Sequence, residues 1–306
     1  MDRTHTVPRW LAESLRSAAR LVDDTAPARA TGILRLGIDL GTSDVVSLAL
    51  DADNKPVAVC LEWADVVRDG VVLNFYGAVG IIRRHLETLR DRLGVEFTSA
   101  ATSYPPGTDP RISVNVLEAA GLEVSGVIDE PSAVAGLLRL DHAAVVDIGG
   151  GTTGIAVLRG GKVVYSADEP TGGRHATLTI AGNNGSSLEE AEALKIAHGK
   201  QVWPIVRPVF EKMADIVRRH LRGHDVDILY LSGGSCAQPG VQELFQQEFP
   251  GYSIVLPPHP LFLTPLAIAA YTGETEEQRL RPLQEQTAEA PTRRAATTAY
   301  PRSTTL

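Results

Sequence analysis

Hydrophobic and polar positions along the chain follow two different periods. Three short apolar runs separated by turn residues predict three consecutive strands, at residues 33–40, 45–50 and 56–61. From Asn74 to Gly94 the apolar residues recur at helical spacing, and the glycine is typical of a helix end. Strands are then predicted at 97–103 and 127–129, each followed by a helix. The predicted order is βββαβαβα.

The same order starts again in the second half of the chain. Apolar runs predict a second three-stranded meander at 143–148, 153–159 and 162–166. The elements predicted after it are helices at 188–198 and 204–221, and strands at 228–231 and 253–256 that lead into helices at 239–249 and 265–271. The opening strands resemble each other, since Gly37-Ile-Asp-Leu-Gly-Thr-Ser43 corresponds to Val145-Val-Asp-Ile-Gly-Gly-Gly151. The pattern indicates two copies of one α/β unit.

The two ends of the chain have a different character. Trp10, Leu11, Leu15, Ala18 and Val22 predict a short amphipathic helix, whose apolar face either docks onto a partner or packs on the protein's own body. The final residues carry almost no large apolar side chain and predict a disordered tail. The predicted division is a helix and linker at 1–32, domains at 33–140 and 141–273, and a tail at 274–306.

Composition limits the classes of partner. The chain is 43% apolar, with 37 acidic and 29 basic residues and a net charge of −8, which argues against general binding to nucleic acid. The two cysteines form no metal-ligand pattern and are typical of a reducing compartment. No apolar run has the length of a signal peptide core or a membrane span. We therefore expect a cytoplasmic protein without nucleic-acid or membrane partners.

A glycine-rich segment, residues 149–154, has the G-x-G-x-x-G spacing of a dinucleotide-binding turn. That motif requires a following helix, whereas residues 155–158 continue as a strand, so the glycines predict a hairpin. A glycine-rich hairpin can still present backbone N–H groups to an anion, because no side chain blocks the approach. Two such hairpins facing each other would hold one polyphosphate from both sides.

Two aspartates end the opening strands of the two halves. Asp39 and Asp147 each follow an apolar run, where a charge is costly unless something compensates it. A Mg²⁺ ion coordinated through water would do so, and phosphoryl transfer requires such an ion beside a phosphate clamp. A single strand-ending aspartate more often caps a turn, but two related copies favour phosphate binding.

Two further features are weak evidence for nucleotide binding when each is taken alone. Residues 233–235 form a glycine-rich turn between a predicted strand and a helix. Glu192 and Lys195 lie three residues apart on one helical face, where they could contact a ribose or form an ordinary surface ion pair.

Five segments in this order resemble the actin-like ATPase superfamily, which includes DnaK-type chaperones, bacterial actins and sugar kinases. They are Trp63–Gly70, Ala101–Arg111, Ile128–Ser132, Val146–Gly154 and Gly233–Gly240. The closer resemblance is to a family of short DnaK-like proteins of ethanolamine utilisation, encoded with enzymes of bacterial microcompartments. It implies a duplicated, ribonuclease-H-like α/β fold with a nucleotide cleft between its two domains.

The resemblance also implies roles for individual residues. The two phosphate-binding motifs would be Asp39, Gly41, Thr42 and Ser43, and Asp147, Gly149, Gly150, Gly151 and Thr152. The other contacts would be Gly172 and Gly173 near the γ-phosphate, Glu192 and Lys195 at the ribose, and Gly233, Gly234 and Ser235 at the adenosine. Asp39, Glu130 and Asp147 would form the catalytic group, in which the aspartates hold Mg²⁺ through water and Glu130 helps to position the attacking water.

The sequence departs from DnaK-type chaperones in two ways. The short stretch between Leu61 and Asn74 contains no lysine to match their catalytic lysine, and Arg68 is its only basic residue. There is no room for a peptide-binding β-sandwich. We expect a slow, chaperone-like Mg-ATPase that assists or reactivates a microcompartment enzyme, with an ethanolamine-utilisation enzyme or a shell protein as its partner. The alternatives are a nucleotide-controlled assembly protein and, more weakly, a small-molecule kinase, because sugar kinases carry larger inserts.

Overall fold

The computed structural model describes residues 6–22, 24–28, 30, 32–64, 67–68 and 71–271. The predicted tail at 274–306 and parts of the predicted linker lie outside the described residues. Within the described ranges, no helix is both long and apolar enough to cross a membrane.

The first sheet has five strands in the order β3-β2-β1-β6-β7. Its strands are β1 (Arg35–Leu40), β2 (Asp44–Leu50), β3 (Pro56–Trp63), β6 (Ser99–Tyr104) and β7 (Glu123–Asp129). The first three strands are antiparallel neighbours and β6 and β7 join them in parallel. Two short strands, β4 (Val67–Arg68) and β5 (Val71–Val72), form a separate hairpin. The predicted meander is confirmed.

The second sheet repeats this topology in the order β10-β9-β8-β11-β12. Its strands are β8 (Ala143–Ile148), β9 (Thr153–Arg159), β10 (Lys162–Glu169), β11 (Ile228–Ser232) and β12 (Ser253–Val255). Strands β8, β9 and β10 are again antiparallel, whereas β11 and β12 join in parallel. The equivalent strand orders confirm a duplicated α/β fold of the actin-like class.

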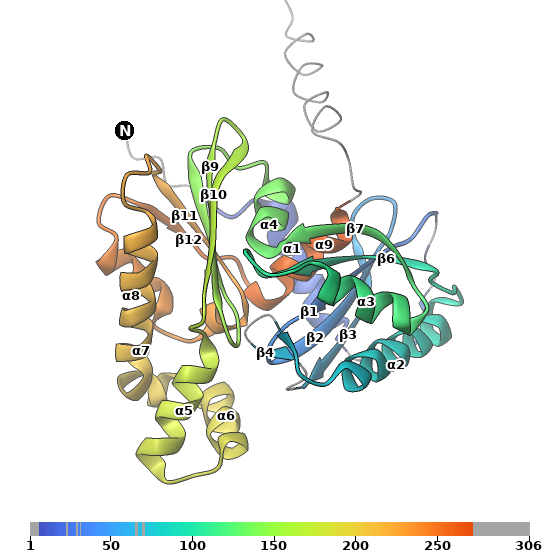
Figure 1. Ribbon diagram of the computed structural model, residues 1–306, viewed down its shortest axis with the longest axis horizontal. Coiled ribbons are helices and arrows are strands. Elements are labelled where there is room, and N and C mark those ends of the chain that lie inside the picture. Colours follow the sequence, from blue (N-terminus) through green and yellow to red (C-terminus); the bar gives the residue numbers. More distant parts are fainter. Residues whose placement is uncertain are drawn as a thin grey trace, which may run out of the picture. The chain divides into compact units, whose positions relative to one another are not determined.

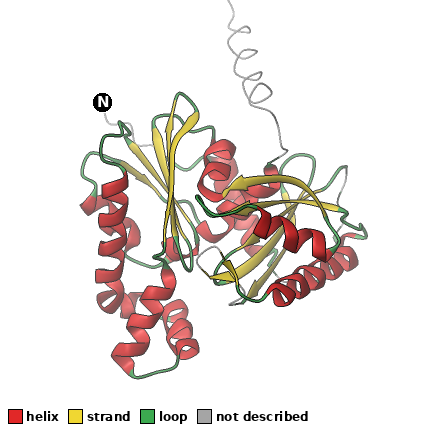
Figure 2. Cartoon of the chain, viewed as in Figure 1, coloured by secondary structure: helices red, strands yellow, loops and turns green. Residues whose placement is uncertain are grey.

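Helices cover both sheets (Figures 1 and 2). On the first sheet they are α2 (Phe75–Leu93) and α3 (Arg111–Ala120), whereas α4 (Glu130–Leu138) packs mainly on β8 and β9 of the second sheet. On the second sheet they are α7 (Gly199–His220) and α8 (Val241–Glu248), while α5 (Gly173–Asn184) and α6 (Leu188–Ala197) pack on α7. Two short 3₁₀ helices, η1 (Gly234–Ala237) and η2 (Pro260–Phe262), contact each other. The last helix of the described residues, α9 (Leu263–Ala270), returns to the first sheet and packs on β1 and α4. The division of the chain at residue 140 stays a prediction.

Two helices differ from the prediction. Helix α5 was not predicted as a helix, because residues 173–184 show no apolar stripe and its N-cap, Gly172, has no side chain to cap it. Helix α7 begins at Gly199 rather than at Pro204, so that Pro204 and Pro208 lie inside it. The turn before Pro204 is held in place because Gln238 Nε2 donates a hydrogen bond of 2.8 Å to the carbonyl oxygen of Gly199.

The N-terminal helix α1 (Arg9–Arg20) packs on the protein's own body. Leu11, Leu15 and Ala18 are completely buried in the hydrophobic cluster that also contains α4 and α9, and α1 lies against β3 and η2. Buried Arg92 fixes the chain after this helix, because its guanidinium donates to the Asp24 carboxylate at 2.8 Å. The apolar face of α1 therefore packs within the chain through its three buried residues, whereas Trp10 is 47% exposed.

Candidate functional site

The two glycine-rich hairpins meet at the ends of their strands. One is the β1–β2 turn, residues 41–43, and the other is the β8–β9 turn, residues 149–152. A Cβ atom added to Gly150 would lie 2.0 Å from Ser43 Oγ, and one added to Gly151 would lie 2.6 Å from Thr42 Cγ2. The two hairpins can therefore approach this closely only because neither glycine has a side chain.

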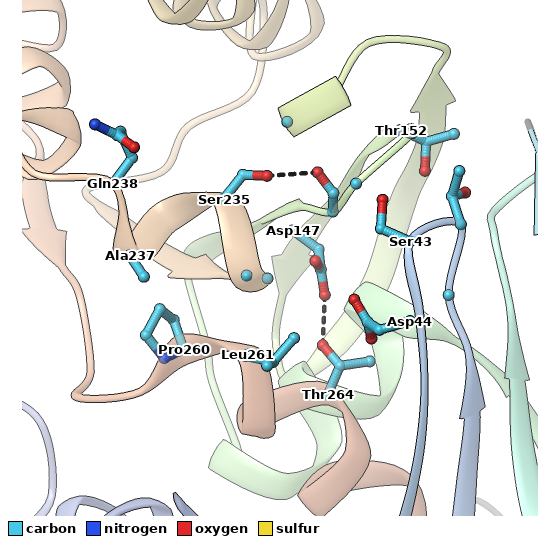
Figure 3. A pocket seen from close by; sticks show the side chains of 18 of the residues that line it. Ser43, Asp44, Asp147, Thr152, Ser235, Ala237, Gln238, Pro260, Leu261 and Thr264 are labelled. Atoms are coloured by element: carbon cyan, nitrogen blue, oxygen red, sulfur yellow. Dashed lines mark hydrogen bonds between the residues drawn. The ribbon is translucent and has the colours of Figure 1, made fainter. Parts of the chain in front are cut away.

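A cavity of about 360 Å³ lies at this junction (Figure 3). Every residue predicted for the site except Gly172 lines it. Gly172 lies directly behind the second hairpin, where an added Cβ would come within 2.7 Å of the Gly150 carbonyl oxygen. The start of α5 is anchored to the same hairpin, since the Gly173 amide donates to the Gly149 oxygen at 2.9 Å. The fold therefore brings the separate sequence motifs around one space.

Hydroxyl groups hold the two strand-ending aspartates. Ser103 Oγ, on β6, donates to Asp39 Oδ1 at 3.1 Å. Thr264 Oγ1, on α9, donates to Asp147 Oδ2 at 2.5 Å and also lies 3.0 Å from Ser232 Oγ (Figure 3). Each carboxylate is thus oriented by a hydroxyl group of a neighbouring element.

Burial and mutual repulsion raise the pKa of these acids. Burial raises the pKa of Asp39 to about 8, and the charges of Asp44 and Asp147 add to the effect. The pKa of Asp44 rises to about 7 through burial and the charges of Asp147 and Glu192. Burial also raises the pKa of Asp147, although its hydrogen bonds from Thr264 and Ser232 oppose this. A cation would stabilise all three charged forms.

Glu130 belongs to the same electrostatic group. It is the first residue of α4 and lines the cavity. Burial raises its pKa well above the ordinary value, and the charges of Asp39, Asp147 and Asp168 raise it further. Asp168, on β10, does not line this cavity but lines another of about 430 Å³, which shares Thr152 with it.

The chemistry of these carboxyls fits a hydrated Mg²⁺ ion. Within the described ranges, no group of three or more histidine, cysteine, aspartate or glutamate residues is arranged to bind a metal directly. Mg²⁺ retains several waters in most protein sites and is held by few carboxylates. Asp39 and Asp147 would hold such an ion through its waters, between the two hairpins.

The cavity is also lined by an ion pair and by the third glycine-rich turn. Lys195 Nζ lies 2.7 Å from Glu192 Oε2 and donates to Thr177 Oγ1 at 2.9 Å. The side chain of Lys195 is only 15% exposed, so the pair is not an ordinary surface ion pair. Ser235 Oγ donates to the Gly149 oxygen at 2.7 Å and connects the third glycine-rich turn to the second hairpin (Figure 3).

Several cavity residues were not predicted. Asp44 and Trp63 come from the first sheet, Ile196 from α6, and Leu261 and Thr264 from the segment that returns to the first sheet. Asp44 directly follows Ser43, so its place beside the first phosphate motif was the available signal. Thr264 belongs to no motif, and only the return of α9 brings it to Asp147. For Arg68 the structure describes the backbone alone.

Replacing Asp39 with Asn should change how stability depends on pH in protein freed of nucleotide and metal. The ordinary aspartate pKa is 3.8, and the pKa of Asp39 in the folded protein is about 8. Between pH 3.8 and pH 8 the folded state therefore holds a proton that the unfolded state has lost. Wild-type stability should therefore decrease as the pH rises through this window. At pH 8 we expect Asp39→Asn to be more stable than wild type by about 1–3 kcal/mol, because a buried charge is removed.

Thermal unfolding at pH 5 and pH 8 with chelator present measures this difference. Asp53→Asn is a suitable control, because Asp53 is exposed on the β2–β3 turn. Identical pH profiles for Asp39→Asn and wild type would contradict the prediction.

Two sheets of equivalent topology, with glycine-rich hairpins and paired aspartates around one cavity, define an actin-like ATPase fold. The sequence profile of cell division protein FtsA matches residues 144–271. The structure of MreB 5 of Spiroplasma citri bound to AMPPNP aligns with a TM-score of 0.62 at 15% identity, and covers 84% of this chain and 99% of that chain.

A more specific relationship is evident from two further proteins. Ethanolamine utilization protein EutJ of Escherichia coli (strain K12) is 62% identical over 268 residues, which are 88% of this chain and 96% of that protein. The crystal structure of EutJ from Carboxydothermus hydrogenoformans has a TM-score of 0.77 at 39% identity, and covers 84% of this chain and 98% of that chain. The chain belongs to the EutJ family of ethanolamine utilization proteins.

Proposed function

We propose that this protein binds Mg-ATP in the cavity between the two hairpins and hydrolyses it slowly, as a chaperone-like ATPase of ethanolamine utilisation. The observation that carries the proposal is the convergence of both glycine-rich hairpins and the buried carboxylates Asp39, Glu130 and Asp147 on one cavity. Backbone N–H groups at glycine-rich turns suit phosphate oxygens, and raised carboxyl pKa values suit a bound cation.

In this proposal each part of the cavity has one task. Residues 41–43 and 149–152 hold the phosphates, and Glu192 with Lys195 contacts the ribose. Mg²⁺ neutralises charge that develops on the phosphoryl oxygens. Glu130, at the start of α4, orients the attacking water. Lys195, the only lysine among the described cavity residues, is engaged by Glu192, which supports slow rather than fast hydrolysis.

The biological setting is inferred from the family. Membership in the EutJ family supports a role in ethanolamine utilisation, with an enzyme or shell protein of a bacterial microcompartment as the partner. In this proposal the protein acts by assisting or reactivating that enzyme.

A nucleotide-controlled assembly protein is the second candidate. The match to cell division protein FtsA over residues 144–271 supports it. ATP-dependent light scattering distinguishes the candidates: a chaperone-like ATPase should give no increase, whereas an assembling protein should scatter more light when ATP is added.

Isothermal titration calorimetry of the full chain tests the proposed function. We expect heat of binding for ATP with Mg²⁺ and much weaker binding with a chelator, because the carboxylates repel the phosphates when no cation is present. A steady-state phosphate-release assay should then give slow turnover. No detectable binding of Mg-ATP would overturn the proposal.

A further inference from the structure

The cavity has a wall on the first sheet that the predicted site did not include. Asp44 begins β2 and Trp63 ends β3, and the two residues are opposite each other in the antiparallel ladder. Both line the cavity. The Ala64 amide donates to the Ser43 carbonyl oxygen at 3.1 Å, so the strand end that carries Trp63 is fixed to the first hairpin. The position of this wall relative to the phosphate-binding backbone is therefore defined.

Both halves of the fold contribute an exposed large apolar side chain to the cavity. Trp63 is 56% exposed, and Ile196, on α6 of the second sheet's half, is 64% exposed. Both line the same cavity. Exposed indole and aliphatic surface is costly in water, and it suits the flat face of a nucleobase or the carbon face of a sugar. Phosphate would gain nothing from these side chains, so they indicate the nucleoside part of a ligand.

The carboxylate of Asp44 faces the same space. In the described part of the chain it accepts no hydrogen bond and forms no ion pair, whereas Asp39 and Asp147 each accept one from a hydroxyl. Lys195, on α6, is paired with Glu192. Asp44 therefore offers a hydrogen-bond acceptor without a partner, next to an aromatic ring. A sugar hydroxyl is a neutral donor that satisfies such an acceptor.

We propose that Asp44 and Trp63 form a second nucleoside-binding wall, in which Trp63 packs against the nucleoside and Asp44 accepts a hydrogen bond from a ribose hydroxyl. This inference rests on the proposed nucleotide function and extends it to the sugar. Glu192, Lys195 and Ile196 come from the other half of the fold and line the same cavity, so a bound nucleoside contacts both halves. Asp44 then selects ribonucleotides over deoxyribonucleotides, because an analogue without the hydroxyl leaves a buried acceptor unpaired.

Calorimetry with Mg²⁺ and three ligands tests the role of Asp44. ATP, 2′-deoxyATP and 3′-deoxyATP are compared on wild type, Asp44→Ala and the control Asp53→Ala, which removes an exposed carboxylate of the β2–β3 turn. For one of the deoxy analogues we expect wild type and Asp53→Ala to prefer ATP by about tenfold, the effect of one hydrogen bond to a charged acceptor. In Asp44→Ala that preference should fall to about one.

Tryptophan fluorescence tests the role of Trp63. The chain has three tryptophans, so Trp63→Phe and the control Trp10→Phe separate its signal from the others. Saturating Mg-ATP should protect wild type and Trp10→Phe from acrylamide quenching, and most of this protection should be absent in Trp63→Phe. Trp63→Ala should weaken ATP binding by roughly tenfold, through loss of stacking.

The outcomes separate this inference from the proposed function. If wild type binds Mg-ATP but Asp44→Ala keeps the ribose preference, or changes only the dependence on Mg²⁺, the role of Asp44 is overturned. If quenching of Trp63 is the same with and without ATP, the role of Trp63 is overturned. If wild type binds no nucleotide at all, the proposed function fails and this inference fails with it.

Discussion

Asp147→Asn should weaken Mg²⁺-dependent ATP binding by about 100-fold or more, the effect of removing one charge from a desolvated set of paired charges. The substitution keeps the shape of the side chain. It removes a charge that would hold the ion opposite Asp39. The fold should remain intact, because Thr264 and Ser232 also bond to each other at 3.0 Å. Since burial raises the pKa of Asp147, the nucleotide-free variant should be at least as stable as wild type.

Calorimetry with and without Mg²⁺, together with thermal unfolding, measures both effects. Asp141→Asn is the matched control. Asp141 precedes β8 in the same half of the chain, but it accepts hydrogen bonds from Gly161 and His142 amides outside the cavity. Retained Mg-ATP affinity in Asp147→Asn would show that this carboxylate does not hold the ion.

Much of the fold could be predicted because most strands are continuous apolar runs. The apolar runs of β1 to β3 and β8 to β10 are separated by glycine and polar turns, so their order and their repetition are visible in the sequence. Helix α5 could not be predicted in this way, since its position depends on hydrogen bonds between its first turn and the hairpin at 149–152. Local sequence carries little information about such a tertiary contact.

The candidate site also contains residues that could be predicted from the sequence and residues that could not. The glycine-rich turns could be predicted because each is a local motif, and the resemblance to known families added Glu192 and Lys195. The partners of these motifs could not be predicted, because they are distant in sequence. Thr264 reaches Asp147 only through the return of α9 to β1, and Trp63 reaches the cavity only through its pairing with Asp44.

The contact between β1 and α9 is also where a small substitution should have a large effect on stability. Gly37 lies in β1 and is buried against α9. A Cβ atom there would lie 2.4 Å from the Ala269 nitrogen and 2.6 Å from its Cα atom. These are backbone atoms, so no side-chain rotation relieves the clash and the helix itself must move. Gly37→Ala should lower the free energy of unfolding by about 1–3 kcal/mol, and Gly37→Val by more.

Gly182→Ala is the matched control for Gly37→Ala. It makes the same chemical change on exposed α5, where an added Cβ meets no atom within 4 Å, so it should stabilise the protein by up to about 1 kcal/mol. Because α9 carries Thr264, displacement of this helix in Gly37→Ala should also weaken Mg-ATP binding, whereas Gly182→Ala should leave binding unchanged. Denaturant unfolding and calorimetry on the same preparations measure the two effects. Equal stability of Gly37→Ala and wild type would mean that α9 can move from β1 at no cost, and the link from β1 through α9 to Asp147 would then be wrong.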